Sequence, residues 1–141
     1  MERRNFIKTT CKLCLLGSAG FLLTQLESCA PATGNSLYKT EASNNQLEIP
    51  LSLFDKSSLQ FISVKGWYFD IAVQKNKNDY TALLLQCTHQ SNQLTTVSDG
   101  YSCSLHGSRF DKNGNVTNGP AEAPLKKYKT SVNQTNLIIH I

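Results

Sequence analysis

Apolar and polar positions divide the chain into a short N-terminal segment and a longer remainder with a different pattern. The N-terminal segment places Arg3 and Arg4 ahead of a largely uncharged, apolar stretch from Leu13 to Leu23. A membrane-spanning helix needs about 20 apolar residues, so this stretch is short for a span. Basic residues before a short apolar stretch are typical of a bacterial export signal, and a retained anchor helix is the alternative. We expect residues 1–28 to be this signal.

Short runs of β-branched, aromatic and leucine residues, separated by turn-forming residues, characterise the remainder. Residues 67–73 and 80–85 predict two strands, and the hydrophilic residues 74–79 between them predict a hairpin loop. A last strand is expected at residues 137–141. Further turns are predicted at residues 98–100, 111–115 and 133–136. No run of ten or more residues here has helical periodicity, so the sequence predicts an all-β fold, a small antiparallel sandwich or barrel.

The junction between these two parts carries processing motifs. Arg3-Arg4-Asn5-Phe6-Ile7-Lys8 resembles the twin-arginine signal, which implies transport of an already folded protein with its cofactor in place. Leu26-Glu27-Ser28-Cys29 resembles a lipobox, in which a diacylglyceryl group is attached to Cys29 and the chain is cut before it. Residues 29–45 are rich in Ala, Pro, Thr, Gly, Asn and Ser, which predicts a flexible tether. The folded domain is then expected at residues 46–141.

Charge and length narrow the possible functions. The 141 residues include 14 Lys and Arg against 10 Asp and Glu, and much of the basic excess lies in the first dozen residues. The remainder has no block of like charge that could neutralise a nucleic-acid backbone, so nucleic-acid binding has no support. A domain of about a hundred residues has a limited core, and a bound metal centre would add to its stability.

The chain has five cysteines, and only Cys87 and Cys103 lie beyond the first 29 residues. His89 follows Cys87 by two residues, and His106 follows Cys103 by three. A single disulfide would not require either histidine. Two pairs of one thiolate and one imidazole could hold one tetrahedral zinc ion, or two irons with the cysteines on one and the histidines on the other.

Three segments together resemble the Rieske iron-sulfur family. Cys87-Thr88-His89 and Cys103-Ser104-Leu105-His106-Gly107-Ser108 resemble the two cluster-binding loops. Gly119-Pro120-Ala121 resembles the proline loop that covers the cluster, and the resemblance extends over roughly residues 65–130. It implies a Rieske-type all-β domain, a small antiparallel sandwich or barrel with a cluster-binding subdomain.

The same resemblance implies a cofactor and its ligands. Cys87 and Cys103 would bind the inner iron of one [2Fe-2S] cluster, and His89 and His106 the outer, solvent-facing iron. Neutral imidazoles in place of two thiolates raise the reduction potential into the range of about −150 to +300 mV. The implied function is one-electron transfer, and any catalysis would belong to a partner subunit.

Other positions modify this expectation. Ser108 matches a family serine whose hydroxyl donates to a bridging sulfide, which raises the potential. Phe110 stands where the quinol-oxidising members have a tyrosine that donates to the sulfur of the residue matching Cys87. Those members also join their loops by a disulfide, at the positions of Asn92 and Leu105. We therefore expect an intermediate potential and less rigid loops.

Three alternatives concern the partner and the metal. The chain could be the Rieske subunit of a larger oxidoreductase, docked on a cytochrome, a quinol-oxidising complex, or a large molybdenum or haem subunit. It could be a ferredoxin that supplies a ring-hydroxylating oxygenase, although the export signal argues against this. A structural Cys2His2 zinc module is the third. With the signal and lipobox, we expect the protein on the periplasmic side of a bacterial membrane, held there by lipid.

Overall fold

The computed structural model of the chain describes residues 37–77 and 79–141. Arg3, Arg4 and Cys29, together with the expected signal boundary at residue 28, lie outside these residues. Among the residues that are described, no helix combines the length and the apolar character needed to cross a membrane.

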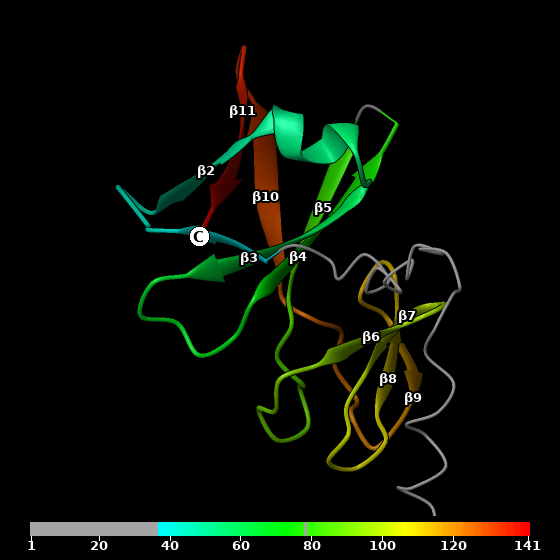
Figure 1. Cartoon of the computed structure of the whole chain (residues 1–141). Helices are drawn as coiled ribbons and strands as arrows, with labels where there is room; N and C mark the ends of the chain where they lie inside the picture. Colours follow the sequence, from blue (N-terminus) through cyan, green and yellow to red (C-terminus); the bar gives the residue numbers. More distant parts are fainter. Residues whose placement is uncertain (1–36, 78) are drawn as a thin grey trace, which may run out of the picture. The chain divides into compact units, whose positions relative to one another are not determined.

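The larger of two sheets has seven strands in the order β1-β3-β4-β5-β10-β11-β2. Their bounds are β1 Leu37–Thr40, β2 Gln46–Pro50, β3 Leu59–Val64, β4 Ile71–Asn76, β5 Asp79–Leu84, β10 Lys127–Val132 and β11 Asn136–His140. Neighbours pair antiparallel, except that β1 runs parallel to β3. The edge strands β1 and β2 lie beside each other, so the sheet is almost closed into a barrel (Figure 1). A short 3-10 helix, η1 Leu51–Asp55, connects β2 to β3.

The barrel interior is filled by alternate side chains of its strands. Leu47 and Ile49 of β2 are fully buried, while the residues between and beside them are exposed or partly so. Leu137 and Ile139 of β11 follow the same alternation. Successive strand residues point to opposite faces, so this alternation places one face of each strand inside the barrel. Complete burial of such a side chain stabilises the fold by about 1.5–3 kcal/mol.

Strands β4 and β5 are buried on both faces. Ile71, Val73, Ala82 and Leu84 belong to the core of the barrel, whereas Ala72 and Leu83 point to a second apolar cluster. These strands therefore have continuous apolar runs instead of alternation. The second cluster holds ten buried residues: Ala72, Leu83, Leu85, Cys87, Leu94, Tyr101, Cys103, Phe110, Ala121 and Leu125.

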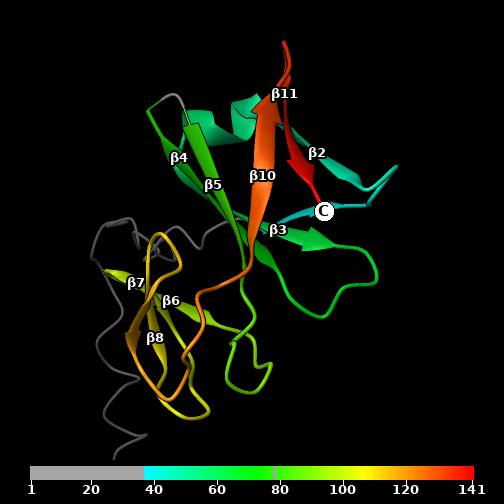
Figure 2. The same cartoon turned by 180° about the vertical axis from the view of Figure 1, so that it is seen from behind.

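Four short strands between β5 and β10 form the smaller sheet. They are β6 Thr95–Val97, β7 Gly100–Ser102, β8 Arg109–Asp111 and β9 Val116–Asn118, paired antiparallel in chain order. At Gly100 a Cβ atom would lie 2.0 Å from the carbonyl oxygen of Phe110, so only glycine permits β7 and β8 to approach as they do. Seen from behind, the smaller sheet lies at the end of the domain away from β11 (Figure 2).

The all-β fold expected from the sequence is confirmed, with differences at the element boundaries. Residues 37–40, expected in the tether, form β1 and pair with β3. The expected hairpin loop is mostly strand, because β4 and β5 remain paired from Ile71↔Leu84 to Asn76↔Asp79 despite their polar residues. Residues 67–70, expected to begin a strand, form the β3–β4 loop, where Tyr68 is 95% exposed.

Candidate metal centre

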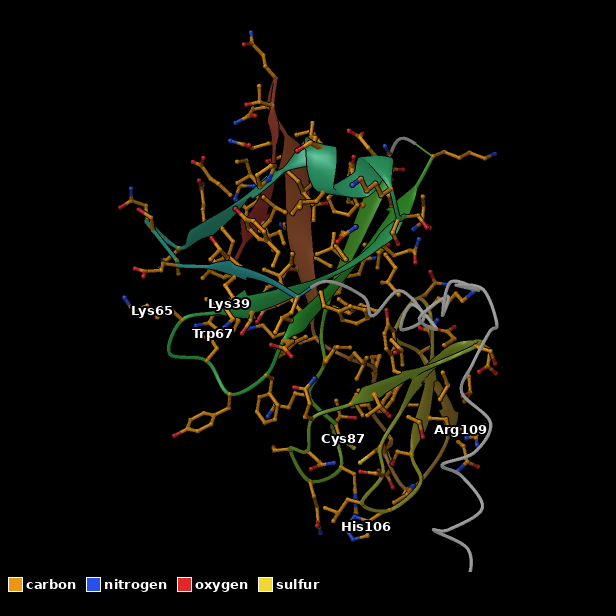
Figure 3. All side chains as sticks on the ribbon, in the orientation of Figure 1. Lys39, Lys65, Trp67, Cys87, His106 and Arg109 are labelled. Atoms are coloured by element: carbon orange, nitrogen blue, oxygen red, sulfur yellow. The ribbon has the colours of Figure 1, made fainter. Side chains whose placement is uncertain are left out.

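Two loops beside the second apolar cluster carry the four candidate ligands. The first loop connects β5 to β6 and contains Cys87 and His89, and the second connects β7 to β8 and contains Cys103 and His106. An isolated bridge between Gln86 and Gln93 closes the base of the first loop. Figure 3 shows Cys87 and His106, from different loops, at the same end of the domain. The fold thus brings together segments that are separated by the whole of β6 and β7.

Local hydrogen bonds turn the chain sharply around each cysteine. The Cys87 N–H donates to the carbonyl of Asn92 over 2.8 Å, and Ser91 N–H donates to the carbonyl of Cys87 over 2.8 Å. In the second loop, Gly107 N–H donates to the Cys103 carbonyl over 3.0 Å, with Gly107 at a φ of 79°. Glycine adopts this left-handed backbone without the steric cost of a Cβ atom, and it reverses the chain directly after the second histidine.

The two thiols form a buried pair. Cys87 is 1% exposed and Cys103 is 2% exposed, and neither is in a disulfide. Both belong to the apolar cluster that also contains Leu85 and Leu94. Two cysteines that are buried among apolar residues and not joined by a disulfide are protected from solvent, which suits sulfur ligands to an iron-sulfur centre.

Hydrogen bonds around Cys103 favour its thiolate form. Burial raises the pKa of this thiol, but hydrogen bonds from the Leu105 backbone, the Cys87 side chain, the His106 backbone and the Asn92 side chain lower it. The net pKa of Cys103 lies below its usual value. The thiolate is the form of cysteine that binds metal, so these hydrogen bonds favour the form of Cys103 that a metal ligand would need.

The two imidazoles form an exposed pair. The ring centroids of His89 and His106 are 4.9 Å apart, with an interplanar angle of 83°. Both residues are exposed, in contrast to the cysteines that precede them in each loop. Within residues 37–77 and 79–141, no three His, Cys, Asp or Glu side chains converge on one metal position. The four side chains are instead arranged as thiol with thiol and imidazole with imidazole.

A third segment packs against both loops. The backbone N–H of Ala121 donates to the hydroxyl of Ser108 over 3.0 Å, and Asn118 Nδ2 donates to the Gly107 carbonyl over 3.0 Å. Thr88 Oγ1 donates to the Ala123 carbonyl over 2.6 Å, which connects the first loop to the same segment. The Gly119–Pro120 peptide bond within the segment is cis.

The residues beside the loops fit a sulfide-containing cluster. Ser108 is fully buried and accepts a hydrogen bond from Ala121, so its own hydroxyl proton remains for donation to a neighbouring acceptor. Phe110 is 2% exposed within the apolar cluster and supplies no donor. The sequence singled out both residues, but it gave no indication of the side-chain contact from Asn92 Nδ2 to Cys103 Sγ, at 3.7 Å. The only relevant feature of the sequence was that Asn92, whose side-chain amide can donate two hydrogen bonds, stands at a position that holds a disulfide cysteine in quinol-oxidising members.

Two short loops that present buried thiols and exposed imidazoles beside a small antiparallel sheet define a class of all-β iron-sulfur proteins. The sequence profile of the Rieske [2Fe-2S] domain matches residues 51–129, and the chain belongs to this family. One Rieske-type [2Fe-2S] cluster is the cofactor of the family and of this chain.

Two curated relatives match the chain over half of its length or less. The cytochrome b6-f complex iron-sulfur subunit of Chlorobaculum tepidum is 26% identical over 73 residues, which are 50% of this chain and 40% of that protein. The subunit of the same description from Chlorobaculum thiosulfatiphilum is 33% identical over 61 residues, which are 42% of this chain and 34% of that protein. The chain therefore matches well under half the length of these curated relatives.

Solved structures show the same fold. The cyanobacterial plasma membrane Rieske protein PetC3 from Synechocystis PCC 6803 matches 65% of this chain and 96% of its own, with a TM-score of 0.54 and 22% identity. A chain in the complex of reduced oxygenase and oxidized ferredoxin in carbazole 1,9a-dioxygenase matches 70% of this chain and 94% of its own, with a TM-score of 0.52 and 19% identity. The expected family, fold and cofactor are thereby confirmed.

Proposed function

We propose that Cys87 and Cys103 bind one iron of the cluster, that His89 and His106 bind the other, and that the histidine side exchanges single electrons with a redox partner. The observation that carries this proposal is the division of the four side chains into a buried thiol pair and an exposed imidazole pair. A single zinc ion would need all four side chains around one position. Two irons with different ligands need two positions, one of which faces solvent.

Each group of residues then has a separate task. The bound cluster supplies a site that accepts and returns one electron at a potential of about −150 to +300 mV. Cys87 and Cys103 hold it against the apolar cluster, which excludes water from the sulfur side. The exposed imidazoles of His89 and His106 would shorten the distance between the cluster and a docked partner. Ser108 offers its free hydroxyl proton from a fully buried position.

The spectrum of the folded chain, expressed with iron available, tests the ligand assignment. We expect a red-brown oxidised protein that gives a rhombic EPR signal of a mixed-ligand cluster after reduction by dithionite. Exchange of His106 for Cys should move that signal towards the all-cysteine type, because a neutral ligand is replaced by a thiolate. A colourless chain with one zinc ion and no EPR signal would contradict the assignment.

We further propose that the domain works outside the cytoplasm, with a diacylglyceryl group on Cys29. The twin-arginine and lipobox motifs support this proposal, and the former suits a protein that must receive its cluster before transport. Mass spectrometry of the membrane-extracted protein should show the lipid on Cys29, and Cys29→Ser should release the protein into the soluble fraction. Replacement of Arg3 and Arg4 by Lys should stop export.

A second candidate function is that of a Rieske subunit in a larger redox complex. The two curated relatives are described as subunits of the cytochrome b6-f complex, which favours a membrane complex as partner. Phe110 and Leu105 depart from the quinol-oxidising pattern, and we therefore expect a potential below that of quinol-oxidising members. Co-purification of the tagged protein with a haem or molybdenum subunit would favour this function, and isolation as a free monomer would favour the single-chain electron carrier.

A further inference from the structure

The side-chain amide of Asn92 connects the two loops at a ligand sulfur. Its Nδ2 lies 3.7 Å from the Sγ of Cys103, although Asn92 itself belongs to the loop of Cys87. Its backbone carbonyl accepts the N–H of Cys87 over 2.8 Å. One residue of the first loop therefore fixes the backbone of one cysteine and contacts the sulfur of the other.

A second hydrogen bond fixes the orientation of this amide. Nδ2 also donates to the carbonyl of Gln93 over 3.2 Å. If the amide were turned over, its oxygen would face that carbonyl oxygen, and the two acceptors would repel each other. The amide therefore presents an N–H group to the sulfur, which accepts a hydrogen bond best as a thiolate.

Asn92 occupies a position where the quinol-oxidising members of the family have a disulfide cysteine. The other disulfide position is Leu105, which is 54% exposed and has no group to form such a bond. In this chain the Asn92 side chain supplies a different connection between the loops, one that ends on a cluster ligand.

We propose that Asn92 is a positioning residue that raises the reduction potential of the cluster through its N–H···S hydrogen bond to Cys103, in addition to joining the two loops. The inference rests on the proposed role of Cys103 as a ligand. A bound cluster would take up one electron from a redox partner or an electrode without any bond being made or broken, so the total negative charge of the cluster and its ligands, the Cys103 sulfur included, would increase by one. A donor at the sulfur stabilises that charge and favours the reduced state.

The test compares two variants that remove an amide of the same shape from two places. Asn92→Leu removes the donor at the sulfur. Asn118→Leu removes an amide whose described hydrogen bonds go to the Gly107 and Gly119 carbonyls and to no cysteine. Protein-film voltammetry measures the potential of each, and the loss of visible absorbance measures cluster lifetime. Asn92→Asp, which keeps the shape but places an ionised acceptor there at neutral pH, is the third variant.

We expect Asn92→Leu to lower the equilibrium constant for reduction about fivefold, which is about 40 mV at 59 mV for each factor of ten. Asn92→Asp should lower it further, because a carboxylate repels the added charge. Asn118→Leu should change it less than about twofold while shortening cluster lifetime as Asn92→Leu does. Equal potential shifts in the two leucine variants, or no shift in either Asn92 variant, would overturn the inference alone. A wild-type chain that takes up no cluster would overturn the proposed ligands together with it.

Discussion

The barrel and the cluster-binding end of this domain are stabilised in different ways. Barrel strands have four to six residues and enclose a core of aliphatic and aromatic side chains. Strands of the smaller sheet have three residues each, and two of the ten buried residues beside them are the cysteines. The barrel is thus held by its own apolar contacts, whereas the smaller end combines a smaller apolar cluster with loop hydrogen bonds and with what its cysteines bind. Stability and redox function should therefore respond to different substitutions.

The substitution with the largest expected effect should abolish cluster binding at the smaller end while the barrel stays folded. Cys103→Ser replaces a buried sulfur, the proposed iron ligand, by a hydroxyl, which is a poor substitute for a soft thiolate ligand. We expect complete loss of the cluster, seen as loss of visible absorbance and of iron per chain, while far-UV circular dichroism retains the strand signal of the barrel. The control is His140→Asn, at an exposed histidine that is hydrogen-bonded to Ser131, and it should keep the full cluster content. Retention of the cluster by Cys103→Ser would contradict the ligand assignment.

A substitution in the barrel core should have the opposite result, a lower free energy of unfolding with an unchanged cluster potential. Leu137→Ala opens a cavity at a fully buried barrel position and should lower the free energy of unfolding by about 2–5 kcal/mol. Ile139→Val, on the same strand, should cost about 0.5–1.5 kcal/mol. Urea unfolding measures both, and voltammetry should find the cluster potential unchanged in both. A shifted potential would show that the barrel core and the cluster are coupled.

A glycine in the smaller sheet offers a moderate effect that is confined to the cluster-binding end. Gly100→Ala places a Cβ atom against the Phe110 carbonyl and the Asp111 backbone, so β7 and β8 must move apart. We expect a loss of about 2 kcal/mol and faster release of the cluster. Gly66→Ala, in the β3–β4 loop, meets no neighbouring atom and has only the strain of its positive φ, about 1–2 kcal/mol. Cluster release at the wild-type rate in Gly100→Ala would argue against a mechanical link between this sheet and the ligands.

The smallest expected effect concerns the β8–β9 turn and its pH dependence. Burial raises the pKa of Asp111, but hydrogen bonds from Asn115, Asn113 and Gly114 hold it below its usual value. A lowered folded-state pKa adds stability above the ordinary carboxyl pKa, and this contribution is lost as the pH falls through the folded-state value. Asp111→Asn should therefore cost about 0.5 kcal/mol at pH 7. The difference from wild type, measured by urea unfolding, should shrink below about pH 4. A difference that is constant from neutral to acid pH would exclude a role for the charge.

The sequence was most informative where spacing alone carries the chemistry. The two Cys-His pairs and Gly119-Pro120-Ala121 indicated the family and its cofactor, because the spacing of these residues is local and needs no knowledge of packing. β1 could not be recognised in the same way. Its residues Leu-Tyr-Lys-Thr have no apolar run, and they form a strand because β3 offers them an edge to pair with.

Long-range contacts explain the remaining differences. The polar ends of β4 and β5 remain paired because the buried residues further along both strands fix their register. Trp67, expected to begin a strand, lies in the β3–β4 loop and packs against Tyr128, with ring centroids 6.2 Å apart. These two residues are far apart in the sequence. The contact of Asn92 with Cys103 forms only when the β5–β6 and β7–β8 loops meet, so no local sequence pattern predicts it.

The pairing of β2 with β11 has a consequence for the order in which the chain folds. Gln46 lies opposite His140, 94 positions later in the sequence, so the barrel cannot close until its last strand has been synthesised. The smaller sheet is made only of neighbouring hairpins, β6 to β9, and closes short loops. Contacts between near neighbours in sequence form sooner than distant ones. The cluster-binding end can thus take shape during synthesis, and the barrel is completed last.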